Sequence, residues 1–161
     1  MFRFLQNHPH FLEKVYDGME RAIRPFSRWL KVNGRLQPMM IFAEKVGKGD
    51  VFDCQMCGQC ILHSTGMTCP MTCPKNLRNG PCGGVRLNGR CEVYPDRDCV
   101  WTVAYERSLQ MPDYGDEMIL IQPPINKQLE GSSSWINMLD GVDKVTPKGW
   151  VTVGTIEVTK I

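Results

Sequence analysis

The chain has 161 residues, 42% of them hydrophobic and 9% aromatic, which is enough to bury one modest core but excludes two large domains. It is also too short for a complete flavin- or nicotinamide-dependent barrel enzyme, because such a barrel alone takes about 250 residues. The formal net charge of +2 is too small to indicate binding to nucleic acid or to a membrane surface.

The start of the chain does not resemble a secretory signal peptide, because Gln6, Asn7, His8 and His10 interrupt its short apolar run. No run approaches the roughly 18 apolar residues that a membrane-spanning helix needs. We therefore expect a cytoplasmic protein with reduced thiols, without membrane insertion. In that compartment its eight cysteines indicate metal binding, whereas in a secreted chain they would indicate disulfides.

The first part of the chain predicts a helix that begins near Pro9, with Asn7 or His8 as its N-cap. Pro25 should kink or divide this helix, and Asn33-Gly34 should end it. Apolar residues recur three or four positions apart along it, which predicts a face for the core or for a docked partner. The apolar residues are Phe11, Leu12, Val15, Met19, Ala22, Ile23, Phe26, Trp29 and Leu30.

A second apolar segment, Met39 to Val46, predicts a shorter helix that stops at a turn over residues 47–50. The cysteine-rich stretch that follows has little periodicity, but Asn88-Gly89 between two short β-prone runs is a strong hairpin signal. A helix over about 99–110 should come next, with Asp96 or Asp98 as its N-cap.

The last part of the chain gives weaker signals. Residues 118–121 predict a strand, residues 131–134 a linker and N-cap, residues 135–139 one or two helical turns, and residues 151–161 another strand. The expected fold is a small, metal-stabilised α+β protein. It comprises N-terminal helices, an irregular cysteine-rich core with a β-hairpin and one following helix, and a β-prone tail.

We divide the chain into three parts on this basis. Residues 1–50 form a helical docking segment, residues 51–112 a cysteine-rich metal-binding domain, and residues 113–161 an extended tail that contacts a partner. The two ends carry more apolar residues than a small cysteine-rich core can cover, and uncovered patches of that kind mark interfaces.

The cysteines carry the clearest chemical signal. Cys54, Cys57 and Cys60 form C-x-x-C-x-x-C, a spacing that brings three thiolates onto one inorganic core and is usual for a 4Fe–4S cluster. A structural zinc site more often uses two separated C-x-x-C pairs. The triple therefore favours iron–sulfur, while structural zinc at one or both sites stays open as the alternative.

Five further cysteines bring the total to eight, enough for two four-thiolate sites with none left over. Cys69-Pro70 and Cys73-Pro74 have the Cys-Pro form that follows the cysteine run of bacterial ferredoxins, although the spacing after Cys60 is not a ferredoxin repeat. Which cysteines share a site is not determined by the spacing. The predicted ligands are Cys54, Cys57, Cys60, Cys69, Cys73, Cys82, Cys91 and Cys99.

Other side chains give only minor signals. His63 lies three residues after Cys60, and with eight cysteines present we interpret it as a loop residue rather than a ligand. A basic collar around the thiolates would offset their negative charge or meet an acidic partner. Its members are Lys75, Arg78, Arg86, Arg90 and Arg97. No Rossmann, P-loop, serine-hydrolase or zinc-protease motif is present, so no catalytic residue is predicted.

The cysteine-rich stretch resembles the methylenetetrahydrofolate reductase C-terminal-domain family, over roughly residues 50–110. The resemblance rests on Phe52 to Cys60, on Ser64 to Pro70, on Cys73 to Lys75, on Leu77 to Val85, and on the segments at Cys91 and Cys99. That family includes the small, zinc-finger-like or iron–sulfur subunit of two-subunit methylenetetrahydrofolate reductases.

The resemblance implies an accessory subunit of an oxidoreductase in one-carbon metabolism, with the flavin and the folate held by a separate barrel-type catalytic subunit. The eight cysteines match the family's ligand pattern, which implies two 4Fe–4S clusters or zinc. Our first hypothesis is electron transfer from a low-potential donor to the partner's flavin. The alternative is a non-redox zinc scaffold of the same enzyme, or of a related one-carbon or corrinoid methyltransferase system.

Overall fold

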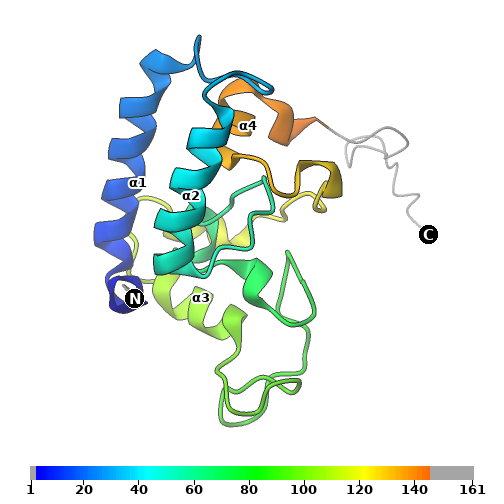
Figure 1. The fold of residues 1–161 in the computed structure, drawn as a ribbon. Coiled ribbons are helices and arrows are strands. Elements are labelled where there is room, and N and C mark those ends of the chain that lie inside the picture. Colours follow the sequence, from blue (N-terminus) through cyan, green and yellow to red (C-terminus); the bar gives the residue numbers. More distant parts are fainter. Residues whose placement is uncertain (1–2, 146–161) are drawn as a thin grey trace, which may run out of the picture.

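The computed structural model describes residues 3–145, and over this range the protein consists of helices joined by loops (Figure 1). The α-helices are α1 (Pro9–Ile23), α2 (Gln37–Phe52), α3 (Val100–Ser108) and α4 (Ser134–Asp140). Seven short 3-10 helices, η1 to η7, lie between and beside them. No helix among the described residues is long and apolar enough to span a bilayer.

The predicted α+β class is wrong, because the described residues contain no sheet. The turn at Asn88-Gly89 does form, and Gly89 N–H donates to the Arg86 carbonyl at 2.8 Å. Only isolated bridges flank it, one between Val85 and Cys91 and one between Arg90 and Asp98. Arg90 and Cys91 are neighbours in the sequence but pair with different segments of the chain. No hairpin ladder therefore extends from the turn.

The two other predicted strands do not support the α+β class either. Residues 118–121 were expected to be extended, but Gly115–Ile119 form the 3-10 helix η5, whose Ser64–Glu117 hydrogen bond of 2.6 Å ties it to η3 (His63–Thr65). The predicted strand over residues 151–161 lies outside the described residues.

The N-terminal helices are present, with one difference from expectation, in α2. Helix α1 has His8 as its N-cap and Pro9 in its first turn, and it passes into the 3-10 turn η2 (Arg24–Phe26) around Pro25. Helix α2 continues through the turn predicted at residues 47–50 and ends at Phe52. Its C-cap, Asp53, has a left-handed backbone conformation. An i,i+4 ion pair between Glu44 and Lys48, at 2.7 Å, spans the first of the two glycines there.

Helices α3 and α4 match the expected positions. The N-cap of α3 is Cys99, without a side-chain cap bond, and neither Asp96 nor Asp98 takes that place. The N-cap of α4 is Ser133, whose hydroxyl accepts a hydrogen bond from the Ile136 N–H. A cap at the end of the Gly-Ser-Ser-Ser run was the sequence expectation.

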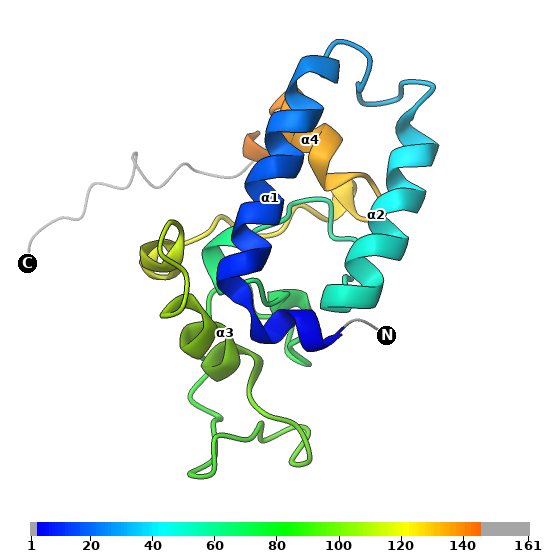
Figure 2. The same cartoon turned by 90° about the vertical axis from the view of Figure 1, so that its left-hand side faces the viewer.

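Helices α1 and α2 lie antiparallel, with α4 near one end of the molecule and the loop of residues 81–98 at the other (Figures 1 and 2). The main buried cluster joins α1 to the cysteine-rich loops. It contains Leu12, Leu62, Met67, Cys69 and Met111. A second buried cluster under α3 contains Cys99, Trp101 and Ala104. The apolar core is therefore built partly from the cysteines themselves.

The segment after α3 folds back on the first three cysteines. Asn137 of α4 donates through Nδ2 to the Gly58 carbonyl at 2.8 Å, and Gly131 N–H donates to the Met56 carbonyl at 2.8 Å. The Gln59 side chain bonds to the backbone of Asn126 and Asp143, at 2.6 and 2.8 Å. These contacts fix the backbone of residues 56–59.

Candidate metal centre

The eight cysteines are free thiols that come from three parts of the chain. Cys54, Cys57 and Cys60 lie in the loop directly after α2. Cys69 and Cys73 flank the 3-10 helix η4 (Pro70–Thr72). The remaining three, Cys82, Cys91 and Cys99, lie on the loop that leads into α3. The fold brings all three parts together on one side of the helix pair.

Four of the cysteines line a small cavity of about 20 Å³ beneath the end of α2. They are Cys54, Cys57, Cys60 and Cys69. The loop that carries the first three is tight, because Gly58 has a φ of +74° and a side chain there would collide with the Leu129 carbonyl. Glycine is therefore needed at this position.

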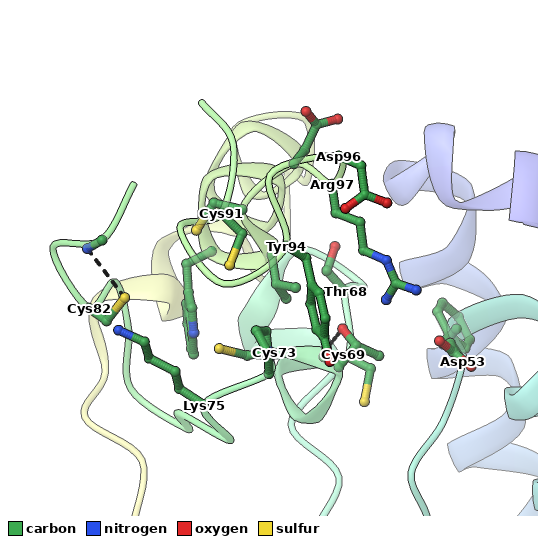
Figure 3. A pocket seen from close by; sticks show the side chains of 18 of the residues that line it. Asp53, Thr68, Cys69, Cys73, Lys75, Cys82, Cys91, Tyr94, Asp96 and Arg97 are labelled. Carbon is green, nitrogen blue, oxygen red and sulfur yellow. Dashed lines mark hydrogen bonds between the residues drawn. The ribbon is translucent and has the colours of Figure 1, made fainter. Parts of the chain in front are cut away.

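The other four cysteines line a larger cavity of about 410 Å³ beside the N-terminus of α3. They are Cys73, Cys82, Cys91 and Cys99. In Figure 3 the sulfur of Cys73 turns toward the side of the pocket that holds Cys82 and Cys91. Cys99 is the N-cap of α3 and is buried.

Cys69 lines both cavities, and two observations place its thiol with the first. Its sulfur points away from Cys73 and the pocket of Figure 3. Its pKa is raised to about 12, chiefly by burial and next by the charge of Cys54, with Cys60 acting in the same direction. We therefore group the thiols four and four, a grouping that the spacing of the cysteines alone did not suggest.

Two backbone N–H groups point at the sulfur of the cysteine two residues earlier in the chain. Met56 N–H donates to Cys54 Sγ at 3.4 Å, and Gly84 N–H donates to Cys82 Sγ at 3.3 Å (Figure 3). Burial raises the pKa of the Cys54 and Cys69 thiols, and backbone hydrogen bonds at Met56 and Met71 oppose that rise. Such N–H···S turns stabilise a thiolate and suit a metal-bound cysteine.

The donor set fits thiolate-bound metal by its chemistry, four sulfurs around each of two cavities with N–H groups directed at sulfur. Within residues 3–145, no three His, Cys, Asp or Glu side chains stand close enough to hold one metal ion. The four-and-four grouping therefore rests on which cavity each thiol lines and, for Cys69, on the direction of its sulfur.

His63 lines neither cysteine cavity. Its ring stacks on Tyr16, with centroids 5.2 Å apart, and meets the Tyr114 ring edge-on at 5.5 Å. Nε2 lies 3.4 Å from the Glu117 carboxylate. Burial lowers the pKa of His63, and the neighbouring Glu117, Glu20 and Asp17 oppose that shift.

The predicted basic collar divides into one buried and four exposed members. Arg78 lines the first cysteine cavity and is only 8% exposed. Lys75 pairs with Glu92, and Arg97 lies over the Tyr94 ring at 5.1 Å. Sequence reasoning did not single out Lys48, whose Nζ binds Glu44 and the Ser134 hydroxyl at 2.7 Å each. The four-residue spacing of Glu44 and Lys48 was its only sequence signal.

Comparison with known proteins agrees with the resemblance seen in the cysteine pattern. The family described as methylene-tetrahydrofolate reductase C terminal matches residues 34–128. This range includes all eight cysteines, α2 and α3, and it extends beyond the stretch that carried the resemblance. Searches among curated proteins and solved structures gave no match. The chain belongs to the methylenetetrahydrofolate reductase C-terminal family.

Proposed function

We propose that this protein is the accessory electron-transfer subunit of a methylenetetrahydrofolate reductase. Its eight cysteines hold two four-thiolate centres, and its partner is the barrel-type catalytic subunit that binds flavin and folate. The observation that carries the proposal is the division of the eight thiols between two neighbouring cavities, together with the N–H···S turns at Cys54 and Cys82.

The protein's own residues supply the ligands and their surroundings. The segment 126–143 holds the Cys54–Cys60 loop in place, because Asn137 donates to the Gly58 carbonyl and the Gln59 side chain donates to the Asp143 carbonyl. Leu62 and Met71 line the small cavity with apolar atoms. Iron–sulfur clusters, when bound, supply one-electron transfer. Reduction of the methylene group to a methyl group belongs to the flavin of the partner.

Zinc is the second candidate, and the first cavity favours it. A volume of about 20 Å³ is close to that of one water-sized probe, so a four-iron cluster requires the Cys54–Cys60 loop to move outward. A single zinc ion needs no more room than this. The cavity of about 410 Å³ at Cys73, Cys82, Cys91 and Cys99 has ample space for a cluster. With zinc at both sites the protein is a scaffold without redox activity.

The docking surface that we propose for the catalytic subunit is the groove between α1 and α2. It has a volume of about 310 Å³ and apolar walls, which include Phe11, Val15 and Met19 of α1. These three side chains are exposed, so this part of the apolar face of α1 does not pack against the core. Uncovered apolar surface of this kind is typical of an interface.

Two further observations support the catalytic subunit as the occupant of this groove. Cys60 lies in the wall of the groove and also in the wall of the first cysteine cavity, so a partner seated there adjoins the proposed centre. The connection from α1 to α2 bears four exposed basic residues and no acidic one, which favours an acidic rim on the partner. These basic residues are Arg24, Arg28, Lys31 and Arg35.

Co-expression with a barrel-type methylenetetrahydrofolate reductase tests this proposal. The two chains should co-elute in size-exclusion chromatography, and the complex should reduce methylenetetrahydrofolate with reduced dye as donor. A Cys→Ser change at either centre should lower that activity while the chains still co-elute. An isolated chain that reduces the folate unaided would refute the accessory role. Co-elution with activity indifferent to the Cys→Ser changes would keep the partner and refute electron delivery.

A further inference from the structure

Arg78 is a buried cation that has no carboxylate partner within the described part of the chain. Its side chain lines the first cysteine cavity, and its Nη2 donates to the Gln59 carbonyl at 3.0 Å. Its Nε and Nη1 atoms are buried and have no hydrogen-bond partner among the described residues. An unpaired buried guanidinium is costly, because desolvating a charge takes several kcal/mol that only a nearby anion or hydrogen bonds offset.

The groups of opposite charge within reach of Arg78 are thiolates. Burial lowers the pKa of Arg78, and Cys57 most strongly opposes this, by charge and by hydrogen bonding, followed by the charges of Cys60 and Cys69. Lys48 also lies near the first centre, where burial lowers its pKa but the charges of Cys60 and Glu44 raise it more. Its Nζ is already bonded to the Glu44 carboxylate at 2.7 Å, whereas Nε and Nη1 of Arg78 have no partner among the described residues.

We propose that Arg78 is the counter-ion of the Cys54–Cys57–Cys60–Cys69 centre and donates its free N–H groups to thiolate sulfur. The inference rests on the proposed function only in requiring metal at this centre. Four thiolates around zinc or around an oxidised four-iron cluster leave a net negative charge, and a rigid planar guanidinium meets such charge with several N–H groups at once. Arg78 is thus a positioning residue that retains the metal and raises the reduction potential of a cluster.

Arg86 provides the matched control. It is also an arginine of the cysteine-rich stretch, but it is exposed and lines neither cysteine cavity. Its charge is therefore screened by the solvent, so Arg86→Gln should leave metal retention unchanged. Arg78→Gln removes the charge and one N–H fork, and Arg78→Lys keeps the charge but loses the planar fork.

The experiment uses the full metal-loaded chain purified without air. The rate of metal loss to a chelator is measured for wild type, Arg78→Gln, Arg78→Lys and Arg86→Gln. The reduction potential is measured by EPR-monitored titration if iron is present. We expect Arg78→Gln to lose the metal of one centre about 10- to 100-fold faster, with Arg78→Lys between it and wild type. An iron cluster at that centre should become harder to reduce in Arg78→Gln.

The outcomes separate this inference from the proposed function. Wild-type protein that binds no metal refutes the proposed function. Wild-type protein that is loaded at both centres, with unchanged metal loss and unchanged potential in Arg78→Gln, overturns the role of Arg78 alone. If Arg78→Gln does not fold, Arg78→Lys decides, because it should still bind metal and should lose it faster than wild type. Wild-type retention in Arg78→Lys then overturns the N–H donor role.

Discussion

Glu44 of α2 accepts hydrogen bonds from both the hydroxyl and the backbone N–H of Ser134, at 2.7 and 3.3 Å. Ser134 is the first residue of α4, so the carboxylate of one helix satisfies the open N-terminus of another. Lys48 completes this buried network at 2.7 Å from Glu44. Because α4 holds Gly58 through Asn137, the Glu44 network positions the loop of the first three cysteines.

Glu44→Gln should destabilise the protein strongly. The change leaves Lys48, which is partly buried, without its carboxylate, and the loss should be at most the cost of breaking a fully buried pair, about 3–5 kcal/mol. Urea unfolding of the metal-loaded chain measures the loss. Glu20→Gln is the matched control, since Glu20 pairs with the exposed Arg24 in the same i,i+4 geometry, where solvent screening leaves the pair little effect on stability. Equal losses in the two variants would contradict the structural role of Glu44.

The same network gives the stability of the protein a pH dependence. Burial raises the pKa of Glu44, but the charge of Lys48 and hydrogen bonds from Lys48, Ser133 and Ser134 lower it by more. The net shift of this pKa is therefore downward. A carboxyl with a depressed pKa stabilises the folded state above its unfolded pKa, near 4.3, and this contribution is lost as the pH falls through the folded value. The stability lost between pH 5 and pH 3 should shrink in Glu44→Gln. An identical acid profile for the variant would show that Glu44 does not contribute.

The grouping of the cysteines predicts which serine variants behave alike. Cys57→Ser and Cys69→Ser should each release the metal of the first centre, while Cys73→Ser and Cys82→Ser should each release that of the second. If both centres hold the same metal, each variant should retain about half of it. Metal analysis of the four variants, with EPR spectra where iron is present, measures this. Cys69→Ser grouped with Cys73→Ser would refute the assignment of Cys69.

A charge in the α1–α2 groove should separate the protein from its catalytic partner. Val15 lies in the groove, and Val15→Asp places a carboxylate where we expect apolar contact. Ile121→Asp is the control, since Ile121 is 89% exposed and lies outside the groove. Co-elution with the barrel subunit should be lost in Val15→Asp and kept in Ile121→Asp. Retained co-elution in both would place the interface elsewhere.

The sequence predicted the elements that depend on local signals. Pro9 at a helix start, Pro25 at a helix end and Ser133 as an N-cap each act through their own backbone, and each was recognisable. The C-x-x-C-x-x-C pattern likewise marks three thiols on one short loop. The family match over residues 34–128 confirms the resemblance that this pattern carried.

The parts that sequence reasoning missed depend on contacts between distant residues. The turn at Asn88-Gly89 forms as predicted, but the residues after it form bridges with two different segments. Cys91 pairs with Val85 and Arg90 pairs with Asp98, so no hairpin forms. Helix α2 continues past its two glycines, Gly47 and Gly49. Lys48, which lies between them, is bonded to Glu44 and to Ser134, 86 residues away. The grouping of Cys69 with Cys54, Cys57 and Cys60 depends on the same kind of long-range packing.

Metal analysis of protein that has never met air tests the central claim most directly. Iron, acid-labile sulfide and zinc are measured per chain after anaerobic purification. The electron-transfer account predicts iron and sulfide in equal amounts, about four of each for every cluster. Zinc in place of iron at both centres would contradict that account and leave the protein as a scaffold.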